Sequence, residues 1–181
     1  MKYGSVATTL ELAGLDAKRT ISGGAGELAT AAVLHDFEAC HPEVAVLHSL
    51  RLPDPKTHTD IDHVVVAGRR VWLIDSKCWK PGTLDFWPAP LSQPHAGASR
   101  QQADDGLGAK AIQAYLGRTA PVETPLIVVC PSSRARTTRL GLWRPAGARS
   151  MTGQRFAARV RRIVKQAPAD PGLVAALARL S

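Results

Sequence analysis

Residues 60–77 read DIDHVVVAGRRVWLIDSK, and this stretch decides the fold. Its two runs, 60–67 and 70–77, are rich in β-branched and aromatic residues and are joined by Gly68 and Arg69. Runs of this composition predict β-strands, and glycine suits the first central position of a two-residue type II′ turn. We therefore expect a β-hairpin whose strand partners are counted outward from that turn.

The far end of this hairpin carries two carboxylates. Counting outward places Asp62 directly opposite Asp75; opposed residues have Cβ atoms about 4.5–5.5 Å apart, where like charges destabilise the pairing. A raised pKa on one carboxylate or a bound cation relieves this repulsion, and Mg²⁺ prefers carboxylate oxygens. Strand alternation directs Lys77 to the face of Asp75, where an ammonium can orient a water or stabilise charge on a phosphate. The alternative is a solvated hairpin end whose charged groups face water.

A third acid lies upstream, where SGGAGE at residues 22–27 opens an alanine-rich segment. The pattern predicts a helix from about Gly24 to Cys40, with Ser22 as its N-cap and Glu27 in its early turns. Glu27 thus adds a third candidate acid to the two acids of the hairpin.

Four short motifs follow one another along the chain. They are Gly26-Glu27, Ile61-Asp62-His63, Ile74-Asp75-Ser76-Lys77 and, opening a later helix, Gln102 in Arg100-Gln101-Gln102-Ala103. In their order and spacing they resemble the nuclease-related domain (NERD) family, a branch of the PD-(D/E)XK nuclease superfamily. The resemblance covers roughly residues 20–130, and it is far more specific than any one motif, because each motif is short.

The resemblance implies a nuclease site with Mg²⁺ or Mn²⁺ as its cofactor. Its implied metal ligands are Glu27, Asp62, Asp75 and the backbone carbonyl of Ser76; its catalytic lysine is Lys77, and its helix glutamine is Gln102, with Gln101 as the other candidate. The chain departs from the family pattern at Asp75, where Glu is more usual, and at Cys78, where Asn is frequent. The shorter side chain of Asp75 reduces its reach toward a metal.

Length and composition indicate one domain with an appendage. The chain has 181 residues, of which 45% are hydrophobic, which suits one sizeable core but not two ordinary domains. We expect an N-terminal extension at 1–19, a nuclease core at 20–133 and a basic helical segment at 134–181 that packs on the core. No apolar run of about 18 residues and no signal-peptide pattern occurs, and the three cysteines are widely spaced. These features predict a cytoplasmic protein with reduced thiols and no membrane partner.

Charge is distributed unevenly along the chain. Residues 134–181 contain eleven Lys and Arg against one acid, Asp170, whereas residues 1–133 contain twelve basic and fourteen acidic residues. This asymmetry predicts a polyanionic partner, with DNA as the leading candidate. The alternative is a general compositional preference for arginine.

The stretch 154–165 within this basic segment has helical spacing. Its apolar residues Phe156, Val160, Ile163 and Val164 form one stripe, which predicts a helix packed on the core. The candidate nucleic-acid-binding residues flank this stripe and face solvent: Arg155, Arg159, Arg161, Arg162 and Lys165.

The remaining segments complete an α/β order. We expect a strand at 44–50, a short strand at 82–87, a loop at 88–98, a helix at 99–116 and a buried strand at 126–130. The resemblance implies a central mixed β-sheet flanked by helices, with the active site on the β-hairpin, as in restriction endonucleases. Strand alternation sends His63 to the sheet face opposite Asp62, so we expect it to pack or hydrogen-bond there rather than bind zinc.

We expect these features to make the protein a metal-dependent nuclease that hydrolyses phosphodiester bonds of DNA. Two other classes of function stay open. One is a catalytically inactive nucleic-acid-binding module of the same fold, and the other is a basic protein-interaction domain.

Overall fold

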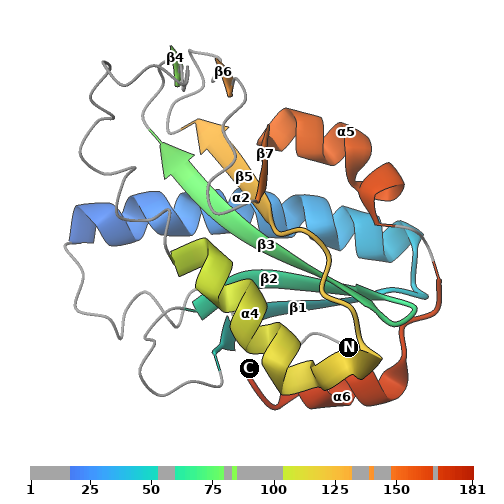
Figure 1. The fold of residues 1–181 in the computed structure, drawn as a ribbon. Helices are drawn as coiled ribbons and strands as arrows, with labels where there is room; N and C mark the ends of the chain where they lie inside the picture. Colours follow the sequence, from blue (N-terminus) through green and yellow to red (C-terminus); the bar gives the residue numbers. More distant parts are fainter. Residues whose placement is uncertain are drawn as a thin grey trace.

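A five-stranded mixed β-sheet forms the centre of the structure (Figure 1). The computed structural model describes residues 17–52, 60–79, 83–84, 104–131, 139–140, 148–164 and 167–181. In chain order, the elements are α2 (Ala17–Cys40), β1 (Ala45–Arg51), β2 (Asp60–Ala67), β3 (Arg70–Trp79), β4 (Thr83–Leu84), α4 (Asp104–Leu116), the 3₁₀ turn η1 (Gly117–Thr119), β5 (Leu126–Pro131), β6 (Arg139–Leu140), β7 (Arg149–Thr152), α5 (Gly153–Ile163) and α6 (Pro171–Ala178).

The strands lie in the order β1-β2-β3-β5-β7. The pairs β1–β2 and β2–β3 are antiparallel, whereas β3–β5 and β5–β7 are parallel. A second, two-stranded sheet consists of β4 and β6. The α/β class and the mixed sheet flanked by helices confirm the prediction and are consistent with a restriction-endonuclease-like fold.

The hairpin of β2 and β3 has the predicted register. Ala67 pairs with Arg70, and the pairing continues outward to His63 and Ile74. Gly68 has φ +58° while its neighbour in the turn does not share a positive φ, as a type II′ turn requires. The turn chemistry therefore sets which side chains of the two strands share a face.

Helices cover both faces of the sheet. On one face, α2 and α5 pack over a cluster that includes Leu34, Phe156 and Val128. On the other face, α4 and α6 pack over a cluster that includes Ile112 and Leu177; Figure 1 shows α2 and α4 on these opposite sides. Because apolar clusters cover both faces of the sheet, charged side chains can be accommodated only at the ends of the strands.

Helix α2 begins earlier than the sequence indicated. It starts at Ala17, so Ser22 lies inside the helix and is not its N-cap, and Glu27 lies near the middle rather than in the early turns. The upstream residues Ala17-Lys18-Arg19 are strong helix formers. A glycine inside a helix costs only about 1 kcal/mol, so the two glycines after Ser22 do not end the helix.

Two other predicted elements are described in part, and one strand was not predicted. The helix expected at 99–116 is described from Asp104, and residues 99–103 and the loop expected at 88–98 lie outside the described part. The short strand expected at 82–87 is seen as Thr83–Leu84. Strand β7, Arg149–Thr152, was missed because RSMT lacks a β-branched run, and its place beside β5 comes from parallel pairing.

Candidate active site

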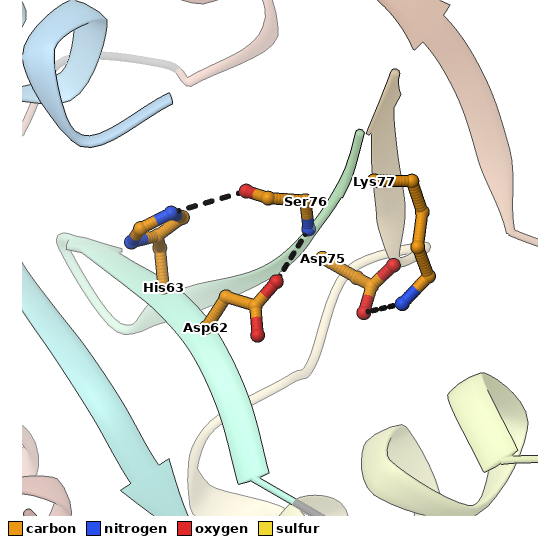
Figure 2. A network of polar contacts seen from close by, with 5 residues as sticks. All are labelled: Asp62, His63, Asp75, Ser76 and Lys77. Carbon is orange, nitrogen blue, oxygen red and sulfur yellow. Dashed lines mark hydrogen bonds and ion pairs between the residues drawn. The ribbon is translucent and has the colours of Figure 1, made fainter. Parts of the chain in front are cut away.

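The structure brings Asp62, Asp75 and Lys77 to the α4 side of the sheet. Side chains two residues apart on a strand share a face, so Asp62 goes with Val64, and Asp75 and Lys77 go with Leu73. Val64 and Leu73 both belong to the cluster under α4 and α6. Nζ of Lys77 donates to Oδ1 of Asp75 at 2.6 Å. The lysine and the two acids therefore form the group that strand alternation predicted (Figure 2).

Asp62 links the two hairpin strands beyond their last backbone pair. Its Oδ2 accepts a hydrogen bond from the backbone N–H of Ser76 at 2.6 Å, while the strand pairing between β2 and β3 ends one residue earlier, at His63 and Ile74. The side chain of Asp62 thus replaces backbone pairing at the end of the hairpin, which fixes its carboxylate beside the strand that carries Asp75.

Burial disfavours the ionised forms of Asp62 and Asp75. Burial, followed by the charge of Asp75, raises the pKa of Asp62 well above its ordinary value, against the opposing effects of Lys77 and the Ser76 N–H. Burial also raises the pKa of Asp75, which Lys77 opposes. Among the described residues, Oδ2 of Asp75 is buried without a hydrogen-bond partner. An unpaired buried carboxylate oxygen is costly, so it marks a place where a proton or a cation would be stabilised.

Glu27 acts on this group electrostatically from helix α2. Its half-buried carboxyl has a pKa raised to about 7, first by burial and then by Asp75, with Lys77 opposing and Asp60 adding. Within the described ranges, however, no three His, Cys, Asp or Glu side chains gather closely enough to hold a metal ion by themselves. The three predicted acids therefore influence one another without forming a closed cluster.

Asp60 is an acid that the sequence interpretation missed. Together with Asp75 and Gly108 it lines a pocket between the sheet and α4. Burial raises the pKa of Asp60, and Arg51 opposes the rise. Its position two residues before Asp62 was the available signal, because strand alternation predicts one face for both side chains.

His48 and His63 form a second polar group on the opposite sheet face. His63 is fully buried, and its Nε2 lies 3.1 Å from Oγ of Ser76. This confirms that His63 hydrogen-bonds away from Asp62. His48 was missed because its contact with His63, Nδ1 to Nδ1 at 2.7 Å, depends on the register between β1 and β2.

Close helix packing explains how Glu27 reaches the site. A Cβ on Gly26 would lie 3.1 Å from both the Cβ and the backbone N of Cys78, a tight contact, so only glycine lets α2 approach β3 this closely. This close approach sets the distance between the next residue, Glu27, and the strand that carries Lys77.

Gly26→Ala is expected to push α2 away from β3 and to lower the free energy of unfolding by about 1–3 kcal/mol, as overpacking does. Gly108→Ala is the matched control, because its Cβ would meet Ile61 at an ordinary 3.9 Å and the helix should gain about 0.5–1 kcal/mol. Urea unfolding measures both. A stabilised Gly26→Ala protein would contradict the close-packing account.

The raised pKa of Glu27 predicts a pH effect on cation-free protein. A carboxyl with a raised pKa in the folded state stabilises that state while protonated, so its contribution is lost as pH rises from 4.5 through about 7. Allowing for solvent screening of the half-buried group, we expect wild type to lose about 1–2 kcal/mol more than Glu27→Gln between pH 5 and pH 8. Urea unfolding in EDTA at both pH values checks this; parallel losses would show that Glu27 is not perturbed.

The predicted nucleic-acid-binding residues lie mainly on α5. Phe156, Val160 and Val164 are buried, which confirms the apolar stripe, and the four arginines at 155, 159, 161 and 162 are exposed. They lie on the face covered by α2, opposite to the hairpin carboxylates. Gln101, Gln102 and Lys165 lie outside the described residues.

Fold and site together define an α/β protein of restriction-endonuclease-like architecture with a carboxylate and lysine site on its central hairpin. Residues 22–94 match the family model described as the nuclease-related domain (NERD), a family whose general context is the PD-(D/E)XK superfamily. The matched range contains Glu27, Asp62, Asp75 and Lys77. Comparisons with curated proteins and with solved structures gave no match. Among the described helices, none is long and apolar enough to cross a membrane.

Proposed function

We propose that this protein is a nuclease that uses Mg²⁺ or Mn²⁺ to hydrolyse phosphodiester bonds of DNA. The observation that carries the proposal is the state of Asp75: one carboxylate oxygen is held by Lys77 at 2.6 Å, and the other is buried without a partner in the described part of the chain. Two neighbouring carboxylates can hold a divalent cation, and a lysine beside them can stabilise the negative charge that develops on a phosphate during hydrolysis.

The donor set fits a hard divalent cation. Asp62 and Asp75 supply carboxylate oxygens of the kind that Mg²⁺ prefers. Burial raises the pKa of both carboxyls, and the charge of Asp75 raises that of Asp62 further; a bound cation would favour the ionised form of each. Asp62, Asp75 and the carbonyl of Ser76 would hold the cation, with Glu27 acting through bridging water. When bound, the cation supplies positive charge that stabilises the developing negative charge on the phosphate and lowers the pKa of a bound water.

The side chains of this protein then have separate tasks in hydrolysis. A water oxygen bonds to phosphorus, the bond from phosphorus to a sugar oxygen breaks, and that oxygen takes up a proton. Lys77 is held by Asp75 and is only 13% exposed, so its ammonium is oriented to position the attacking water and to stabilise the phosphate charge. Asp75 thus orients Lys77 through Oδ1, while Oδ2 would be available to hold the cation.

Lys77→Ala tests this function. We expect supercoiled plasmid to be cleaved by wild type in Mg²⁺ or Mn²⁺ but not in EDTA, and Lys77→Ala to reduce the rate at least about 100-fold, since it removes the oriented charge. Lys110→Ala, at an exposed lysine of α4, is the matched control and should retain the wild-type rate. Cleavage that persists in Lys77→Ala would point to a contaminating nuclease or to another site.

An inactive nucleic-acid-binding module is the second candidate function. It is favoured by the absence, within the described ranges, of three metal-binding side chains in one close group. Calorimetric titration with Mn²⁺ separates the two, because an inactive module would bind DNA but not the cation. Negligible DNA affinity even at low salt would instead favour a basic protein-interaction domain.

A further inference from the structure

A polar histidine is buried on the sheet face opposite the carboxylates. His63 has no exposed surface, and it lies among the side chains of the apolar layer under α2 because it alternates with Val65 of that layer. Burying a polar ring costs free energy unless its nitrogens are hydrogen-bonded. An apolar side chain at this position would avoid that cost, so packing alone gives no reason for a histidine.

The ring of His63 connects the two strands that carry the candidate acids of the hairpin. Its Nε2 lies 3.1 Å from Oγ of Ser76 on β3. Ser76 in turn donates its backbone N–H to Oδ2 of Asp62 at 2.6 Å, as Figure 2 shows. One buried ring on β2 is thus bonded to the strand of Asp75 and, through Ser76, to Asp62.

The ring is held by contacts at both of its nitrogens, one of which is the contact of Nε2 with Ser76. Its second nitrogen, Nδ1, lies 2.7 Å from Nδ1 of His48, and the two rings meet edge to face. Contacts at both nitrogens leave the ring one orientation in which each is satisfied.

We propose that His63 is a positioning residue for the cation site, which it serves by holding Ser76 against Asp62. The inference rests on the proposed function, because it assumes that the carboxylates bind a divalent cation. Residues that orient metal ligands from behind typically contribute 10–100-fold to metal affinity. His63 touches neither substrate nor cation, so its effect should appear in how well the carboxylates bind.

Three substitutions at one position separate hydrogen bonding from packing. We expect His63→Leu to weaken Mn²⁺ binding about 10–100-fold, measured by calorimetry on the full chain. His63→Gln should restore most of the affinity, because its amide reaches the place of Nε2 beside Ser76. His63→Asn should not, because its shorter amide lies near the place of Nδ1. A purely structural role would not distinguish Gln from Asn in this way.

Ser76→Ala gives an independent test with little risk to folding, because it removes only the hydroxyl and keeps the N–H that binds Asp62. If His63 acts through that hydroxyl, Ser76→Ala should also weaken Mn²⁺ binding, and the double variant with His63→Leu should be no weaker than the weaker single variant. Thr30→Val is the control: it removes another buried hydrogen bond, to the carbonyl of Gly26 at 3.1 Å, and should lower stability without changing Mn²⁺ affinity.

Unfolding in EDTA is measured in parallel on every variant. Lower stability with unchanged Mn²⁺ affinity in His63→Leu and Ser76→Ala would overturn the inference and leave His63 as a packing residue. Multiplying effects in the double variant would refute the route through Ser76. A wild-type protein that binds no Mn²⁺ would refute the proposed function and, with it, this inference.

Discussion

Asp62→Asn should abolish metal-dependent DNA cleavage and at the same time make the cation-free protein more stable at pH 8. The amide oxygen of Asn can still accept the hydrogen bond from Ser76, now at 2.6 Å from Oδ2. What is lost is a buried negative charge beside Asp75, whose cost is visible in the raised pKa of Asp62. At pH 8 the unfolded chain ionises Asp62 freely, whereas the folded protein must bury the charge or retain a proton.

The expected sizes differ between the two readouts. Cleavage should fall at least about 1,000-fold, equivalent to about 4 kcal/mol of transition-state stabilisation, while the free energy of unfolding in EDTA should rise by about 1–2 kcal/mol, as in other exchanges of activity for stability. Initial rates on plasmid and urea unfolding measure them. Added Mn²⁺ should stabilise wild type and leave Asp62→Asn unchanged.

Asp170→Asn is the matched control for Asp62→Asn. Asp170 caps α6 by accepting from the backbone N–H groups of Gly172 and Leu173 at 2.9 and 3.1 Å, and Asn caps a helix about as well as Asp does. Activity and stability should therefore both stay near wild type. If Asp62→Asn instead lost stability and kept its activity, Asp62 would be a structural acid and the metal-site account would fail.

Local chemistry explains what the sequence could predict. A two-residue turn with glycine first sets the hairpin register, so the shared face of Asp62, Asp75 and Lys77 follows from counting alone. The apolar stripe of α5 likewise follows from helical spacing. Both predictions use interactions within a few residues along the chain, and the structure confirms the hairpin register as far as His63 and Ile74 and the apolar stripe of α5.

Features that depend on packing between distant segments were beyond such reasoning. The distance of Glu27 from β3 is set by the close packing of Gly26 on Cys78. The contact between His48 and His63 depends on the register in which β1 pairs with β2. The face on which α5 packs depends on the unrecognised strand β7. Each of these is decided by contacts between residues far apart in sequence, where propensity and periodicity carry no information.

Replacing the four exposed arginines of α5 with glutamine should weaken DNA binding strongly and leave Mn²⁺ affinity unchanged. If each of the arginines at 155, 159, 161 and 162 neutralises one phosphate, the slope of log affinity against log salt should become shallower by about 3–4. Glutamine has nearly the helix propensity of arginine, and the buried Phe156 and Val160 are untouched, so stability should change by no more than about 0.5 kcal/mol. Binding to duplex DNA across a salt series measures the slope.

The position of α5 predicts how that effect divides between binding and catalysis. Thr152, just before α5, pairs with Val129, which pairs with Lys77, so α5 begins level with the lysine and two strands away, roughly 10 Å. A DNA backbone crossing the strand ends from Lys77 would meet the start of α5 first. Arg155→Gln with Arg159→Gln should therefore raise KM for cleavage more than Arg161→Gln with Arg162→Gln, and the exposed Arg179→Gln should have no effect. Equal effects from all three would mean that α5 attracts DNA only through its net charge, without a defined path to the site.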